Sequence, residues 1–182
     1  LMTMQRYSAE LYRGLAEAVD YPMNCHVTGS IRLAHGKERM QEFQRAKGMG
    51  RYQGMDVDVV GLDEIKRRYP FIETHELKGA LYDPSDGDID PAQLTQALAK
   101  GARDMGSKII RFCPVTGVRR ENDEWVVETA QGEIRCEIVV NAAGYRAAEV
   151  GKMFGREVPM MVMSHQYILF EEIPELAAWS KE

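Results

Sequence analysis

The stretch Glu137-Ile-Val-Val-Asn-Ala-Ala-Gly144 decides the fold that we expect for this chain. A β-branched run is typical of a strand buried on both faces, as in a sheet covered by helices. The small residues at its carboxyl end would let a ligand approach the backbone closely, and open α/β sheets bind ligands outside the carboxyl ends of their strands. On these residues alone, a tight strand-to-helix turn without a ligand remains the alternative.

Helical and strand patterns alternate on both sides of this stretch. Asp90-Pro91 predicts a helix start, because a carboxylate caps the first turn and proline suits the first helical position. Asn122-Asp123 predicts the turn of a hairpin. The expected helices cover 2–19, 37–45, 64–69 (capped by Asp63), 91–105 and 149–154, and the expected strands cover 30–35, 57–60, 79–82, 108–112, 115–120, 124–128, 134–140 and 160–170. This order predicts an α/β (α+β) fold.

Composition excludes several classes of protein. The 182 residues are 45% apolar, which is enough for a sizeable core, and the net charge of -5 disfavours a nucleic-acid partner. No apolar run approaches the roughly 20 residues that cross a bilayer, so we expect no membrane partner, and no signal peptide is visible. The three widely spaced cysteines predict free thiols in a reducing compartment.

Ser164-His-Gln-Tyr167 carries the second candidate site. On a strand, His165 would share one face with Met161, Met163 and Tyr167. A histidine in apolar surroundings resists charging and could serve as a base near pH 7. The alternative on these residues is a core histidine that bonds a backbone carbonyl.

Other motifs are incomplete. Asp86, Asp88 and Asp90 have the spacing of a calcium loop, but Pro91 occupies the glycine position, so we expect no metal. No Gly-x-Gly-x-x-Gly, P-loop or Gly-x-Ser-x-Gly motif occurs, and the sequence therefore lacks a pyrophosphate cradle.

Several segments together resemble the dimethylglycine and sarcosine dehydrogenase branch of the D-amino-acid oxidase-like FAD-dependent oxidoreductases. The resemblance covers nearly all of the chain in the right order. It is carried by Leu81-Tyr-Asp-Pro-Ser-Asp-Gly-Asp-Ile-Asp-Pro91, Cys113-Pro-Val-Thr-Gly-Val118, Trp125-Val-Val-Glu-Thr129, Val140-Asn-Ala-Ala-Gly144, Glu149-Val-Gly-Lys-Met153 and His165-Gln-Tyr167.

The resemblance implies an FAD-binding lobe interleaved with a strand-rich substrate lobe. Residues 1–20 and 85–158 would belong to the first lobe, and residues 21–84 and 159–182 to the second. It also implies site residues: Val115, Ala142, Ala143, Gly144 and Arg146 would contact FAD, and His165 with Tyr167 would face the substrate.

Two positions depart from the family pattern. Arg146 stands where relatives usually have tryptophan, and Asp88 where several have histidine.

The implied activity is oxidation of an N-methylated amino acid by hydride transfer to FAD, in one-carbon metabolism. A glycine- or D-amino-acid-type oxidase and a non-catalytic interaction domain of the same fold are the alternatives. We expect the chain to be an internal fragment that needs the remainder of its parent polypeptide and is inactive alone. A tetrahydrofolate site would lie outside this chain, and electron-transfer flavoprotein is an implied partner. The expected location is cytoplasmic, or the mitochondrial matrix in a eukaryote.

Overall fold

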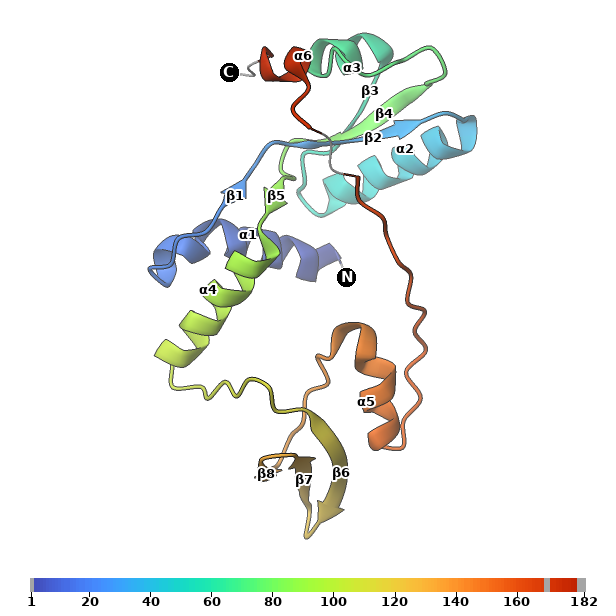
Figure 1. Ribbon diagram of the computed structural model, residues 1–182. Helices are drawn as coiled ribbons and strands as arrows, with labels where there is room; N and C mark the ends of the chain where they lie inside the picture. Colours follow the sequence, from blue (N-terminus) through green and yellow to red (C-terminus); the bar gives the residue numbers. More distant parts are fainter. Residues whose placement is uncertain (1, 169–170, 180–182) are drawn as a thin grey trace. The chain divides into compact units, whose positions relative to one another are not determined.

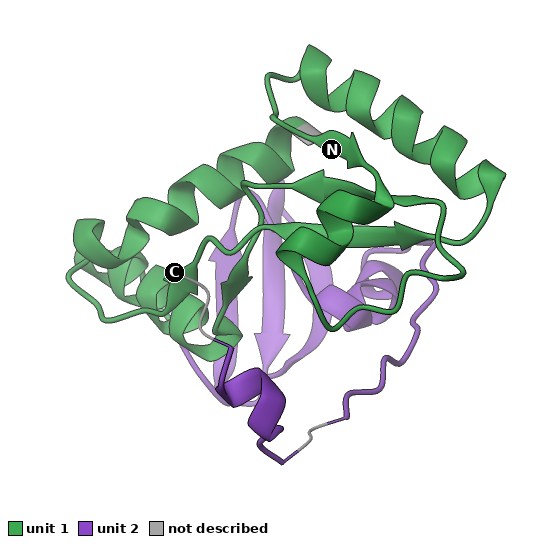
Figure 2. Cartoon of the chain, turned by 90° about the horizontal axis from the view of Figure 1, so that it is seen from above, with its two compact units in different colours: residues 1–109 green, residues 110–182 purple. Residues whose placement is uncertain are grey.

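The computed structural model describes residues 2–168 and 171–179. The chain forms two compact units, residues 1–109 and residues 110–182, which Figure 2 colours separately. Both mix helices with strands (Figure 1), so the predicted α/β (α+β) class is confirmed. The first unit contains α1 (Met2–Ala18), β1 (Cys25–His26), β2 (Ser30–Ala34), α2 (Lys37–Tyr52), β3 (Asp58–Val60), α3 (Leu62–Arg68), β4 (Gly79–Asp83), β5 (Asp88–Ile89) and α4 (Pro91–Asp104). The second contains β6 (Val115–Glu121), β7 (Glu124–Thr129), β8 (Gly132–Cys136), the 3-10 helix η1 (Gly144–Arg146), α5 (Ala147–Met153) and α6 (Pro174–Ala177).

An antiparallel sheet of order β2-β4-β3 holds the core of the first unit. Successive side chains of β4 point to opposite faces, so Leu81 and Ala80 belong to different clusters. Leu81 packs with Phe43 from α2, whereas Ala80 packs with Ile65 from α3 and with Leu77. The sheet is therefore covered by α2 on one face and by α3 on the other.

Two predicted helix boundaries in this unit are wrong. The helix that we expected to end near Gly48 and Gly50 continues to Tyr52. Gly50 is buried, and a Cβ atom there would lie 3.4 Å from the Val57 side chain, an ordinary van der Waals distance. Phe43 and Ala46 of this helix pack in the same core cluster as Val57, and this packing offsets the cost of about 1 kcal/mol for glycine in a helix. The next helix begins two residues earlier than predicted and is capped by Gly61 rather than by Asp63.

The start of α4 agrees with the prediction. The Asp90 carboxylate accepts hydrogen bonds from the backbone N–H groups of Ala92 at 2.8 Å and of Gln93 at 2.9 Å, with Pro91 at the first helical position. Before α4, the short ribbon of β1 and β5 pairs Cys25 with Ile89 and His26 with Asp88.

The second unit is built on an antiparallel sheet of order β6-β7-β8. Its first hairpin turns at Asn122 and Asp123, with φ of 47° and 67°, so the predicted turn is confirmed. On one face, the Trp125 ring meets Phe154, just after α5, edge-on with 5.0 Å between the ring centroids.

Three strand predictions in residues 108–170 are wrong. The structure gives no strand over 108–112, ends β8 at Cys136 instead of Val140, and leaves 160–168 extended but unpaired. Residues 169 and 170 of the last prediction lie outside the described residues. Ile138 and Val140 are 78% and 80% exposed, so the expected burial of this strand on both faces is also wrong. A ladder needs a neighbouring strand, and within the described ranges none lies beside these segments.

Candidate functional site

The turn that follows the apolar stretch is organised by the side chain of Asn141. Its Oδ1 accepts a hydrogen bond from the backbone N–H of Ala143 at 3.2 Å, and its Nδ2 donates to the backbone oxygen of Ala147 at 2.9 Å. We call residues 141–147 the Asn141 turn. The Asn141 side chain thus connects the end of the apolar stretch 137–140 to Ala147, the first residue of α5.

The Asn141 turn contains four of the five predicted cofactor contacts, namely Ala142, Ala143, Gly144 and Arg146. Gly144 has a φ of 57°, a left-handed conformation that glycine adopts without strain. Apart from its two chain neighbours, no described residue has an atom within 4 Å of the position that a Cβ would take. Apart from the half-buried Ala143, these residues are exposed. The structure therefore brings them together on an open turn.

Arg146 keeps its positive charge on this turn. Its Nε donates to the Tyr145 hydroxyl at 3.3 Å, and its guanidinium carbon lies 5.6 Å from the centroid of the Tyr145 ring. The hydrogen bond to Tyr145 raises the pKa of the guanidinium, with smaller contributions from the charges of Tyr145 and Glu149. In the described part of the chain, no carboxylate forms an ion pair with Arg146, so its charge is available to an anion.

The fifth predicted contact, Val115, lies elsewhere in the same unit. It is the first residue of β6, opposite Thr129, and is 39% exposed. An irregularity in strand pairing follows between Val115 and Gly117. The described residues include no hydrogen bond, ion pair or ring contact between Val115 and the Asn141 turn.

His165 and Tyr167 lie on the extended segment 160–168. Both are exposed, Tyr167 by 91%, and neither makes a hydrogen bond or ring contact with any described residue. Met161 and Met163, which we expected on the same face as His165, are 84% and 68% exposed. Neither the expected apolar pocket nor a core position for His165 is present among the described residues.

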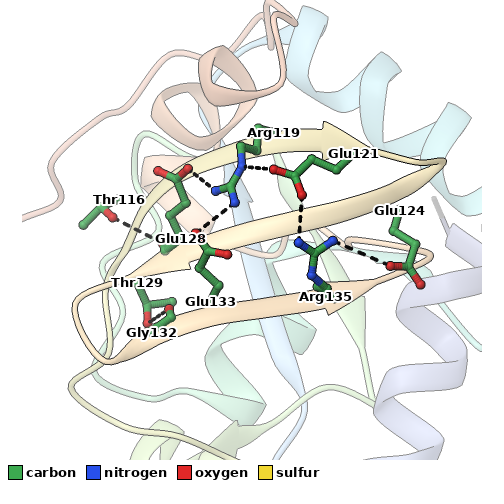
Figure 3. A network of polar contacts seen from close by, with 9 residues as sticks. All are labelled: Thr116, Arg119, Glu121, Glu124, Glu128, Thr129, Gly132, Glu133 and Arg135. Atoms are coloured by element: carbon green, nitrogen blue, oxygen red, sulfur yellow. Dashed lines mark hydrogen bonds and ion pairs between the residues drawn. The ribbon is translucent and has the colours of Figure 1, made fainter.

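A network of ion pairs covers the other face of the β6-β7-β8 sheet (Figure 3). Arg119 donates to Glu121 at 2.7 Å, to Glu133 at 2.9 Å and to Glu128, and Arg135 donates to Glu121 at 2.7 Å. The hydrogen bonds to Glu121, Glu133 and Glu128 raise the pKa of Arg119, and the two arginines lower the pKa of Glu121. Because every member has an opposite charge beside it, the network stabilises the sheet rather than offering a free charge.

Two cavities of the first unit hold polar side chains that the sequence did not indicate. One of about 150 Å³ is lined by Tyr12, Arg13, Cys25 and the His26–Asp88 pair, whose Nδ1 and Oδ2 atoms are 3.0 Å apart. The other, of about 530 Å³, is lined by charges of both signs, Arg6, Arg13, Arg32, Glu10, Asp56, Asp83 and Asp86. None of the predicted site residues lines either cavity.

The described residues contain no group of three or more His, Cys, Asp or Glu side chains that could hold a metal ion. Over the same residues, no helix has the length and apolar character needed to cross a membrane.

Comparisons with known proteins cover nearly the whole chain. Rat mitochondrial dimethylglycine dehydrogenase is 38% identical over 176 residues, which are 96% of this chain and 20% of that protein. Human mitochondrial sarcosine dehydrogenase is 37% identical over 151 residues, which are 80% of this chain and 16% of that protein. The chain thus spans at most about a fifth of the length of these curated relatives.

Solved structures agree with these sequence matches. L-proline dehydrogenase from P. horikoshii has a TM-score of 0.73 and 29% identity over 82% of this chain and 40% of that chain. Glycine oxidase from Geobacillus kaustophilus has a TM-score of 0.69 and 28% identity over 82% of this chain and 41% of that chain. The model of the family described as FAD dependent oxidoreductase matches residues 1–181. The chain therefore belongs to the FAD-dependent oxidoreductase family.

Proposed function

We propose that the chain is part of a flavoenzyme that oxidises an N-methylated amino acid of the dimethylglycine or sarcosine type. The observation that carries this proposal is the 38% identity to rat dimethylglycine dehydrogenase across 96% of the chain. Because the chain spans only about a fifth of that relative, we propose that activity belongs to a longer protein that includes these 182 residues.

FAD is the cofactor that the family description names, and we propose that the Asn141 turn would contact part of it. Open space beside Gly144 would let a flat or phosphorylated group approach the backbone, and the unpaired cation of Arg146 suits an anionic oxygen. Val115 would contact the nucleotide from β6. The chain lacks the glycine fingerprint that cradles a pyrophosphate, so these residues would supply only part of the cofactor site.

We propose that His165 is the base that removes the proton from the amino nitrogen of the substrate. An amino acid with a protonated nitrogen has no free lone pair, so a neutral imidazole that removes this proton would favour oxidation of the adjacent carbon. Tyr167, two residues along the same extended segment, would donate a hydrogen bond next to His165. When bound, FAD supplies the hydride acceptor.

The reaction has a product that can be measured directly. Loss of hydride from the N-methyl carbon leaves a C=N double bond, water adds to that carbon, and cleavage of the C–N bond releases formaldehyde and the demethylated amine. We would assay formaldehyde formed by the complete flavoprotein from dimethylglycine, with glycine and D-alanine as unmethylated controls. Formaldehyde from dimethylglycine alone is expected, and turnover of only the unmethylated amino acids would contradict the proposal.

A glycine- or D-amino-acid-type oxidase is the second candidate, supported by the structural similarity to glycine oxidase. It predicts that glycine or D-alanine is oxidised with release of ammonia and without formaldehyde. A non-catalytic interaction domain, the third reading of the sequence, predicts neither product.

The location that we propose is supported by the same relatives, whereas the partners that we propose rest on the family resemblance of the sequence. The mammalian dimethylglycine and sarcosine dehydrogenases are described as mitochondrial, which supports a matrix location if this chain is eukaryotic and a cytoplasmic one otherwise. Electron-transfer flavoprotein as the electron acceptor, and tetrahydrofolate bound outside this chain, are the partners that we propose with a small N-methylated amino acid as substrate.

A further inference from the structure

We propose that Asn141 is a positioning residue that fixes the Asn141 turn in the conformation that meets the flavin nucleotide. The inference rests on the proposed function, because it takes FAD as the ligand of this turn. It assigns a role to a side chain that need not touch the cofactor.

Both polar ends of the Asn141 amide are used within the turn. Oδ1 accepts from the N–H of Ala143 at 3.2 Å, while Nδ2 donates to the carbonyl of Ala147 at 2.9 Å. Between these two bonds, the N–H of Arg146 donates to the carbonyl of Ala143 at 3.1 Å. The backbone conformation from Ala143 to Ala147 is therefore held by the two bonds of the Asn141 side chain and by one backbone hydrogen bond.

Packing does not fix this turn. Ala142, Gly144, Tyr145 and Arg146 are all exposed, and Gly144 has no neighbour where a Cβ would be. An exposed turn with a left-handed glycine samples many conformations unless local hydrogen bonds select one. Beside the backbone bond between Arg146 and Ala143, the two bonds of Asn141 are the described hydrogen bonds that make this selection.

We call the two hydrogen bonds of Asn141 the Asn141 clasp. Its end at Ala147 is attached to a well-packed helix, α5. Gly151 of α5 is buried, and a Cβ added there would lie 2.6 Å from Val158 Cγ2 and 3.1 Å from the carbonyl oxygen of Arg156. The helix is thus packed tightly against residues 156–158. By bonding the first residue of this helix, Asn141 connects an exposed turn to a fixed element.

The chemistry of this position is specific. The turn needs an acceptor for Ala143 and a donor for Ala147 on one short side chain, which an asparagine amide supplies. Aspartate keeps the acceptor but loses the donor, and alanine loses both. These two substitutions therefore separate the two halves of the clasp.

The first arm of the test measures hydrogen exchange of the Ala143 amide by NMR in the 182-residue chain. Asn141→Ala is expected to speed this exchange about tenfold, because one hydrogen bond is lost. Asn141→Asp should keep the rate within about twofold of the unaltered chain, because its carboxylate still accepts. Asn122→Asp is the matched control: it makes the same change at a hairpin turn, where the side chain has no described hydrogen bond. Unchanged exchange at Ala143 in Asn141→Ala would overturn the proposal.

The second arm adds FAD at millimolar concentration and follows the amide signals of residues 142–146. The unaltered chain is expected to show shifts there, and Asn141→Ala to need at least about fivefold more FAD for the same shift. Equal responses in the two proteins would overturn the positioning role and leave the proposed cofactor contact intact. No response in the unaltered chain would overturn that contact and with it the role of Asn141 toward FAD, whereas the exchange rates would still report the clasp itself.

Discussion

Glu64 shows how a single half-buried carboxylate can make stability depend on pH. It accepts hydrogen bonds from Arg67 at 2.8 and 2.6 Å and from Arg68 at 2.6 Å, and these partners lower its pKa from 4.5 to about 2. A carboxyl group with a lowered pKa in the folded state contributes stability that is present above its unfolded pKa and lost as pH falls through the folded value.

We therefore expect the unaltered chain to be more stable than Glu64→Gln at pH 6, and this difference to shrink as the pH falls from 4.5 toward 2. Urea unfolding of both proteins across this range measures it. A difference that stays constant with pH would show that the ion pairs do not set the pKa of Glu64.

Val126 tests the packing beneath the ion-pair network. It is fully buried and lies between Arg119 and Arg135 in the register of the sheet, so the aliphatic stems of both arginines share its face. Val126→Ala is expected to lower the free energy of unfolding by about 2 kcal/mol, because it leaves a cavity. The same change at Val140, which is 80% exposed, should cost less than about 0.5 kcal/mol. Equal effects in urea unfolding would contradict this account of the sheet.

Among the elements, α4 depends on its capping residue. Asp90→Ala removes the acceptor of two backbone N–H groups and is expected to cost about 1 kcal/mol. Asp56→Ala removes an exposed carboxylate that accepts no hydrogen bond within the described residues, so it should change stability by less than about 0.5 kcal/mol. Thermal unfolding of both variants makes the comparison, and a cap variant no less stable than the control would contradict the role of Asp90.

Elements with local causes could be predicted from the sequence, and those with distant causes could not. Asp90-Pro91 and Asn122-Asp123 specify a helix start and a turn through their own side chains and backbone preferences. The strands expected at 108–112 and 160–170 needed a neighbouring strand, which residue patterns along one segment do not reveal. The continuation of α2 past Gly50 goes with the packing of this helix in the core cluster of Val57 and Leu81, which is another interaction beyond the helix itself.

The candidate site follows the same division. The family resemblance implied Ala142, Ala143, Gly144 and Arg146 together as cofactor contacts. An asparagine before small residues could also have indicated the bond from the Ala143 N–H to Asn141, because asparagine tends to bond the backbone two residues on. The surroundings of His165 and Tyr167 could not be derived from alternation alone, because a shared face is useful only where another element covers it.

At the scale of the whole molecule, we propose that this chain supplies only part of the FAD site, and this limits what the chain can do alone. The Asn141 turn and Val115 would supply contacts, but the sequence has no glycine fingerprint for the pyrophosphate. We expect the 182-residue chain to bind FAD weakly and to show no amine oxidation. Titration of the chain with FAD, followed by flavin fluorescence, measures the affinity, and tight one-to-one binding would contradict this prediction.

We propose that these residues belong to an enzyme that passes a hydride from an N-methylated amino acid to flavin, with His165 as the base. The most direct measurement is the anaerobic loss of flavin absorbance when dimethylglycine is added to the complete flavoprotein and to its His165→Ala variant. We predict rapid bleaching in the former and slowing by about 100-fold or more in the latter, the range expected for loss of a general base. Equally fast bleaching in both would remove His165 from the mechanism, and no bleaching in either would contradict the proposed reaction.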